Sequence, residues 1–187
     1  MLKFLRNCSM ITAAATIGLM CGCKANLPFA GKPDFDSSYT VNAEINCGDL
    51  KAVSDVTRTP DKWIFTFTQP DTLAGVTLEY TENDCGGNLG GLLFDAEKSP
   101  EYTALPDIIR SAVCSISGVS DENISENDGV MTIDTDFNGK KVTVTANSKN
   151  GNLISLKCPF YKLSVQFSDQ KPYTEQPLPE DGGLISN

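Results

Sequence analysis

The residues of this chain best suited to covalent chemistry are its seven cysteines, because it has no histidine to serve as the usual general base. Two of them, Cys21 and Cys23, close an N-terminal segment that has a basic head, Lys3 and Arg6, and a small, apolar core over residues 10–20. This layout is typical of an export signal. The apolar core is too short for a permanent membrane-spanning helix, which needs about 20 apolar residues.

The stretch Leu19-Met20-Cys21-Gly22-Cys23 resembles a bacterial lipobox. The resemblance implies that residues 1–22 are a lipoprotein signal peptide and that the first mature residue is an acylated, palmitate-bearing cysteine. Cys23 is the expected site, because the small Gly22 precedes it, whereas the bulky Met20 precedes Cys21. The alternative is an ordinary signal peptide, or an uncleaved anchor, with incidental cysteines.

Acylation of Cys23 would place the protein at a cell membrane. Two or more acyl chains hold a protein there stably, at ~0.8 kcal/mol per buried CH₂ group. We therefore expect a lipid-anchored protein on the extracytoplasmic face of the cell envelope.

Four cysteines follow Cys23 in the chain: Cys47, Cys85, Cys114 and Cys158. Outside the cytosol an even number of cysteines predicts disulfides, and four cysteines allow three pairings, among which the sequence does not choose. Unpaired buried thiols are the alternative, since free cysteine packs as a small hydrophobic residue. The wide spacing differs from the close Cys-x₂-Cys pairs of a zinc ribbon, so no metal site is expected.

Two groups of carboxylates are candidate sites. The acidic stretch 121–128 has oxygen ligands for calcium but lacks the ligand order of an EF-hand loop, so we expect a solvated loop there. Asp134 and Asp136 project to one side of a predicted strand, where they could act as an acid–base pair or form an ordinary exposed face. No Gly-x-Ser-x-Gly elbow, phosphate loop or dinucleotide fingerprint is present. We expect no enzyme activity and no cofactor.

The chain is acidic, with a formal net charge of −9, and loss of residues 1–22 removes two basic residues and no acidic one. Acidic surfaces repel nucleic-acid phosphates, so the charge argues against a DNA- or RNA-binding protein. The expected partners are the membrane, through the acyl chains, and a lipid or other hydrophobic ligand. Partner proteins are not indicated.

Hydrophobic alternation predicts about nine β-strands, and one segment has helical spacing. The helix is expected near residues 104–117, with Pro106 early and Gly118 after its end. Turns are predicted over 83–87 and a bulge or bend at Gly90 and Gly91. The expected strands cover residues 39–47, 50–58, 63–68, 76–81, 89–94, 129–136, 140–146, 152–158 and 161–167.

These elements predict a mainly β (α+β) fold in one domain, residues 39–168. Residues 23–38 are expected to be a lipidated tether and residues 169–187 a flexible C-terminal tail. A large antiparallel meander with one apolar face must curl or be covered. We therefore expect a large curved sheet, an incomplete β-barrel, covered by the single helix.

The order of elements resembles the outer-membrane lipoprotein carrier (LolA-like) superfamily, which includes the LppX-type lipoproteins. The residues that carry the resemblance are Phe65–Pro70, Leu73–Tyr80 and Gly91–Phe94, read as a strand ending near proline, a leucine-x-glycine entry and a glycine-leucine strand. The resemblance implies a β half-barrel that holds lipid on its concave side and has no catalytic residues. This chain departs from the family in having only one clear helix.

The largest apolar patch that the sequence predicts is formed by Trp63, Phe65, Phe67, Leu78 and Tyr80 on neighbouring strands. One interpretation is the wall of a lipid-binding pocket. The other is a solid core under the helix, in an anchored structural or protein-interaction module that has no ligand. A cavity between sheet and helix distinguishes the two interpretations.

Overall fold

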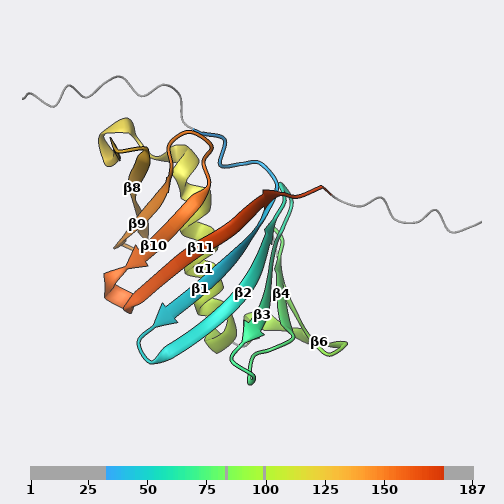
Figure 1. The fold of residues 1–187 in the computed structure, drawn as a ribbon. Helices are drawn as coiled ribbons and strands as arrows, with labels where there is room; N and C mark the ends of the chain where they lie inside the picture. The colour runs from blue at the N-terminus through green and yellow to red at the C-terminus, as the bar shows by residue number, and fades with distance from the viewer. Residues whose placement is uncertain (1–32, 83, 99, 175–187) are drawn as a thin grey trace, which may run out of the picture. The chain divides into compact units, whose positions relative to one another are not determined.

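The computed structural model describes residues 33–82, 84–98 and 100–174 (Figure 1). The predicted signal peptide, Cys23 and the tail after residue 174 lie outside the described residues. Residues Gly31–Asn187 form one compact unit, and every strand pairing falls inside it. This unit therefore contains a complete sheet and core and is expected to fold on its own.

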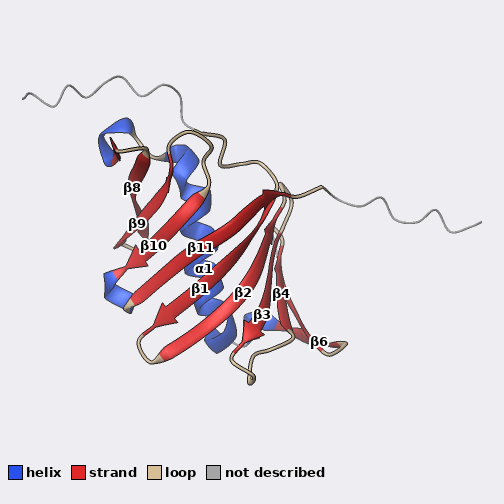
Figure 2. Ribbon diagram, in the orientation of Figure 1, coloured by secondary structure: helices blue, strands red, loops and turns tan. Residues whose placement is uncertain are grey.

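The described residues form a single antiparallel sheet of eleven strands in the order β6-β5-β4-β3-β2-β1-β11-β10-β9-β8-β7. The sheet is strongly curved and not closed into a barrel (Figures 1 and 2). The predicted fold class is confirmed. The strands are β1 Tyr39–Cys47, β2 Leu50–Arg58, β3 Trp63–Gln69, β4 Val76–Tyr80, β5 Cys85–Leu89, β6 Leu92–Asp95, β7 Ile124–Asn127, β8 Val130–Phe137, β9 Lys140–Asn147, β10 Leu153–Cys158 and β11 Leu163–Pro172.

The sheet consists of two meanders that meet in its middle. We call β1–β6 the N-terminal wing and β7–β11 the C-terminal wing, and the pairing of β1 with β11 joins them. The helix α1, Pro100–Ser115, follows β6 at one edge and leads to β7 at the other edge, so it crosses one face of the sheet (Figure 2). We call this the inner face.

Strict alternation in the sequence decides which side chains reach the inner face. In β1, Tyr39, Val41, Ala43 and Ile45 are buried while the residues between them are more accessible. On α1, the buried side chains recur at helical spacing, as in Ile108, Ile109, Ala112, Val113 and Ile116 just beyond its end. The apolar stripe of the helix and the inner face of the sheet therefore form one core.

The region from 83 to 94 corrects one prediction. Residues 89–94 are not a single strand, because β5 and β6 form a hairpin with its turn at Gly90 and Gly91. Both glycines have positive φ, 58° and 91°, which is the backbone of a two-residue hairpin turn and is open to glycine at no steric cost. Cys85, Gly86 and Gly87, expected in a turn, belong to β5.

Three further boundaries differ from prediction. The acidic stretch forms the short helix η3, Asp121–Asn123, and the strand β7, so it is not a plain loop. The helix begins at Pro100, which places Pro106 inside it and not in its first turn. The last strand begins at Leu163 and continues to Pro172, because Tyr39 at the start of β1 pairs with Pro172.

Residues 33–38, expected to belong to the tether, pack onto the sheet, and we call them the strap. Phe35 is buried. Pro33 lies against the turn at Gly151, where a Cβ atom added to the glycine would be only 2.8 Å from the Cβ of Pro33. An apolar anchor in an otherwise polar segment explains why the strap packs. Among the described residues, no helix is long and apolar enough to cross a membrane.

Candidate functional site

One row of side chains crosses the inner face of the N-terminal wing at the end where β1 begins. Antiparallel register pairs Tyr39 with Arg58, Arg58 with Trp63, Trp63 with Tyr80, and Tyr80 with Cys85. All five residues are buried. We call them the rim row. Its tyrosines, arginine and tryptophan give it far more polar atoms than the rows behind it have.

Behind the rim row the inner face is almost entirely apolar. The second row runs from Val41 through Val56 and Phe65 to Leu78, and the third contains Ala43, Ser54 and Phe67. The structure therefore brings the five predicted lining residues together in three neighbouring rows. Trp63 stacks on Phe65 with ring centroids 6.1 Å apart, and Phe65 meets Tyr80 edge-on at 5.9 Å.

These lining residues are covered in the structure. Phe65 and Leu78 have 0% exposure, and Trp63, Phe67 and Tyr80 are 4–6% exposed. A ligand on this part of the inner face therefore requires α1 to move, since its side chains fill the same space.

Arg58 is the one arginine of the rim row, and its side chain is 7% exposed. Its Nη2 atom donates a hydrogen bond of 2.7 Å to Oδ1 of Asp36 in the strap. Its guanidinium carbon lies 5.3 Å from the centre of the Trp63 ring and 6.0 Å from that of Tyr39. Two aromatic rings and one carboxylate thus form the surroundings of a buried cation.

The polar atoms of this cluster are incompletely satisfied. Of the buried side-chain atoms without a hydrogen-bond partner among the described residues, Arg58 Nε, Arg58 Nη1 and the Tyr39 hydroxyl belong to the rim row. The fourth is Nε of Arg110 on α1. Buried donors without partners are rare in native proteins, and each costs about 1–3 kcal/mol.

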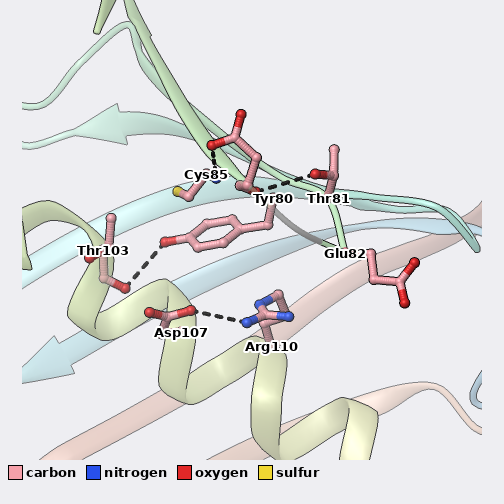
Figure 3. Close-up of a pocket in the computed structure, with 8 residues that line it drawn as sticks. Tyr80, Thr81, Glu82, Cys85, Thr103, Asp107 and Arg110 are labelled. Carbon is pink, nitrogen blue, oxygen red and sulfur yellow. Dashed lines mark hydrogen bonds and ion pairs between the residues drawn. The ribbon is translucent and has the colours of Figure 1, made fainter. Parts of the chain in front are cut away.

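A cavity of about 390 Å³ opens between α1 and the turn from β4 to β5, where the rim row ends (Figure 3). Tyr80 and Cys85 line it from the sheet, and Thr103, Asp107 and Arg110 line it from the helix. The turn adds Thr81, Glu82 and Asp84, so most of the lining is polar. The Tyr80 hydroxyl donates a 3.2 Å hydrogen bond to the Thr103 carbonyl oxygen. Arg110 binds Asp107 at 3.3 Å and lies 5.3 Å from the Tyr80 ring centre.

The electrostatics of the site follow from burial and pairing. Burial raises the pKa values of Tyr39 and Tyr80 well above the ordinary tyrosine value, so both hydroxyls stay protonated near neutral pH. Hydrogen bonds from Arg58 and then Ser117 lower the pKa of Asp36, which stays ionised. Arg58 therefore faces a single carboxylate.

The other predicted site residues lie elsewhere. Cys47, Cys114 and Cys158 are free thiols in the structure; Cys158 is buried and Cys114 is exposed. Cys85 is buried at the start of β5. The Cys47 thiol donates to the Tyr161 carbonyl oxygen at 3.2 Å.

Asp134 and Asp136 each have a separate partner. Asp134 binds Lys141 and Thr143, both at 2.7 Å, and the hydrogen bond from Lys141 lowers its pKa. Asp136 accepts the backbone N–H of Gly139 at 2.8 Å. The two carboxylates therefore support the hairpin of β8 and β9. No group of three or more potential metal ligands occurs in the part of the chain that the structure describes.

Sequence reasoning missed Arg58, Tyr39, Asp36 and Arg110 as site residues. The alternation of Ala52, Ser54 and Val56 directs residue 58 to the inner face. The position of Arg58 on this face could therefore have been predicted from the sequence. Arg110 meets the rim row only because of where α1 crosses the sheet, and no local pattern carries that information.

A scan against protein-family models finds no match, and no curated protein sequence matches this chain. Solved structures do match. An uncharacterized conserved protein from Thermus thermophilus is 10% identical over 78% of this chain and 88% of its own, with a TM-score of 0.49.

Two other matched structures bear the family names to which the sequence was compared. A LolA superfamily protein from Nitrosomonas europaea is 10% identical over 78% of this chain and 90% of its own, with a TM-score of 0.35. The lipoprotein LppX from Mycobacterium tuberculosis is 14% identical over 72% of this chain and 85% of its own, with a TM-score of 0.37. These are likenesses of fold.

Proposed function

We propose that this protein is a membrane-anchored, extracytoplasmic lipoprotein that binds or carries a lipid or other hydrophobic ligand and catalyses no reaction. The observation that carries the proposal is the large apolar inner face that a single helix covers, with a cavity of about 390 Å³, lined mostly by polar side chains, at the end of the rim row. Cavities of about 300–1,000 Å³ are typical of small-molecule sites.

The contacts between α1 and the sheet differ along the length of the helix. This difference provides an entry route for a ligand. Near its end, Ser115 is 2.5 Å from the Thr135 hydroxyl of β8, and Ile116 is fully buried. The backbone of α1 comes closest to β8 and β9, in the C-terminal wing. Its first three turns border the cavity. We therefore expect the N-terminal half of α1 to lift while its last turn stays in place.

A second candidate function is an anchored interaction module with a filled core. The complete burial of Phe65 and Leu78 favours it, because these side chains leave no space around themselves in the structure. The two functions differ in whether α1 separates from the N-terminal wing to admit a ligand.

Native mass spectrometry separates the two candidates. Residues 23–187 with Cys23→Ser would be purified gently from the natural host without detergent. Our proposal expects a co-purifying mass that is lost on denaturation and identifies the ligand. A bare protein mass, together with no uptake of an added fluorescent fatty acid, would instead support the interaction module.

A substitution on the apolar face gives an independent test. Phe67→Asp should abolish ligand uptake in a protein that still folds, because a binding face that opens to admit ligand also admits water to the new carboxylate. In a permanently filled core the same carboxylate would be buried without a partner, at a cost of several kcal/mol, and the protein would unfold. Circular dichroism reports the fold and fluorescent fatty acid reports uptake.

The membrane anchor is tested on the full chain in cells. Labelling with radioactive palmitate should mark the protein, and Cys23→Ser should remove the label and release the protein from the membrane fraction. Cys21→Ser is the matched control and should leave both unchanged. A label that survives Cys23→Ser would refute acylation at this residue.

A further inference from the structure

The rim row holds more hydrogen-bonding capacity than the structure uses. Arg58 is more than nine-tenths buried, and only one of its three guanidinium nitrogens has a partner. The Tyr39 hydroxyl lies in the same cluster, is also buried and has no partner. A buried cation with unpaired N–H groups beside an unpaired hydroxyl is complementary to an anion that offers several acceptor lone pairs.

The structure contains a carboxylate in this position, supplied by the chain itself. Asp36 of the strap places Oδ1 at 2.7 Å from Arg58 Nη2 and Oδ2 at 3.0 Å from the Ser117 hydroxyl. The side chain of Asp36 is 65% exposed, so it reaches Arg58 from the solvent side. It leaves Arg58 Nε, Arg58 Nη1 and the Tyr39 hydroxyl without a partner.

The apolar rows lie directly behind this cluster. Arg58 pairs across the sheet with Trp63, and the next row on the same face begins with Val41, Val56 and Phe65. A molecule with an oxyanion at one end and an apolar chain at the other would place the oxyanion at Arg58 and the chain along Phe65 and Leu78.

We propose that Arg58 and Tyr39 bind the oxyanion headgroup, a carboxylate or a phosphate monoester, of a single-chain amphipathic ligand, and that Asp36 occupies the headgroup site in the empty protein. This inference rests on the proposed function, because the apolar chain needs the opened inner face. Binding of the headgroup exchanges the Asp36 carboxylate for the oxyanion of the ligand, and no covalent bond changes.

The test uses the unit Gly31–Asn187 and its own fluorescence. Trp63 is the single tryptophan of the chain, and its ring lies 5.3 Å from the Arg58 guanidinium. Decanoate and decyl phosphate would be titrated below their micelle concentrations, decanol below its solubility limit, and inorganic phosphate over the same range, while the Trp63 emission is recorded. We expect the two chain-bearing anions to bind at least tenfold more tightly than decanol, and inorganic phosphate to bind more weakly still.

Three variants assign the preference for anions. Arg58→Gln should remove it, so that decanoate binds no better than decanol. Tyr39→Phe should weaken decanoate binding about three- to tenfold without lowering the unfolding midpoint, which keeps the test valid if Arg58→Gln fails to fold. Lys62→Gln is the control, because it removes a positive charge next to Trp63 whose partner, Glu79, lies on the outer face.

Asp36→Ala should change the affinity for decanoate in the opposite direction to Arg58→Gln and Tyr39→Phe. If Asp36 competes with the headgroup, its removal should tighten decanoate binding several-fold and leave decanol binding unchanged. If Asp36 only stabilises the fold, its removal cannot tighten binding, and unchanged or weaker decanoate binding would overturn the inference.

The remaining outcomes separate this inference from the proposed function. Equal affinity for decanol and decanoate, unchanged by Arg58→Gln, would overturn the headgroup site and leave a hydrophobic carrier. Inorganic phosphate binding as tightly as decyl phosphate would indicate a site for free anions and would also overturn it. No response to any of the chain-bearing compounds would refute both proposals.

Discussion

The inner faces of the two wings belong to one sheet and are crossed by one helix. They differ in how closely their side chains pack and in how many of their buried polar atoms have hydrogen-bond partners. On the C-terminal wing, a row runs from Val165 through Leu156 and Val144 to Ile133, and these four side chains have 0% exposure. On the N-terminal wing, the corresponding surface has aromatic rings, a buried arginine and a cavity at its end.

The same contrast holds for hydrogen bonds. Among the described residues, the buried side-chain atoms without a partner belong to β1, to β2 and to the face of α1 that meets Tyr80, and none belongs to β7–β11. Close packing without unsatisfied atoms is what stability requires. Unsatisfied buried donors are a cost in the empty protein that a ligand can remove. If the protein binds a ligand as we propose, the C-terminal wing provides stability and the N-terminal wing provides the binding face.

The largest expected effect concerns packing. Leu156→Ala in the C-terminal wing should lower the free energy of unfolding by about 3–5 kcal/mol, because the surrounding aliphatic residues cannot close the void. Leu78→Ala is the matched change in the N-terminal wing, also at 0% exposure, and should cost about 2–3 kcal/mol because the N-terminal half of α1 can settle into the space. Urea unfolding measures both. Equal losses would refute the difference in packing.

The next effect concerns Asp36 and is pH-dependent. Asp36→Ala should cost about 1–3 kcal/mol at pH 7, because it leaves Arg58 without its carboxylate. Arg58 lowers the pKa of Asp36 in the folded protein, so this contribution is present above the unfolded-state pKa of about 3.9 and is lost as the pH falls through the lower folded-state value. The difference in unfolding midpoint between the two proteins should therefore shrink from pH 6 to pH 3. A constant difference would show that the carboxylate charge is not responsible.

A smaller effect is expected where α1 is attached to the C-terminal wing. The Ser115 hydroxyl donates to the Ala112 carbonyl oxygen, so its bond with Thr135 must use the threonine proton. Thr135→Val removes this bond and should cost about 1 kcal/mol. If the last turn of α1 stays in place while its N-terminal half lifts, the same variant should also speed ligand release. Stopped-flow displacement measures the release rate, and an unchanged rate would place the fixed point elsewhere.

The smallest effect distinguishes two tyrosines of the rim row. Tyr39→Phe removes a hydroxyl that has no partner and should leave the free energy of unfolding within about 0.5 kcal/mol or raise it. Tyr80→Phe removes the bond to the Thr103 carbonyl oxygen and should cost about 1 kcal/mol. Thermal unfolding compares them directly. A clear loss in Tyr39→Phe would mean that its hydroxyl has a partner in solution.

Local patterns predicted most of the sheet, because alternation is a property of each strand by itself. Tyr39–Cys47 and Leu50–Arg58 begin and end as expected, and Trp63, Phe65 and Phe67 share the inner face. The hairpin at Gly90 and Gly91 was mistaken for a bend in one strand, since short glycine-containing strands have too few side chains to show where the pairing reverses.

The candidate site was predicted only in its apolar part. Aromatic residues at alternate positions of one strand can be predicted to share a face from the sequence of that strand alone. The contact of Asp36 with Arg58 joins residues 22 positions apart, and the contact of Asp36 with Ser117 joins residues 81 apart. Such contacts depend on how the strap and α1 cross the sheet, which no window of sequence contains.

The pairing of β1 with β11 determines how early folding of the sheet can be completed. The first and last strands of the described chain are neighbours in the middle of the sheet, so the sheet cannot be completed before β11 is available. Pairings between residues far apart in sequence form slowly, because the intervening chain must first lose its freedom. Until the last strand arrives, the two wings have no direct strand pairing to each other. That delay suits a chain that, as we propose, leaves the cytoplasm before it folds.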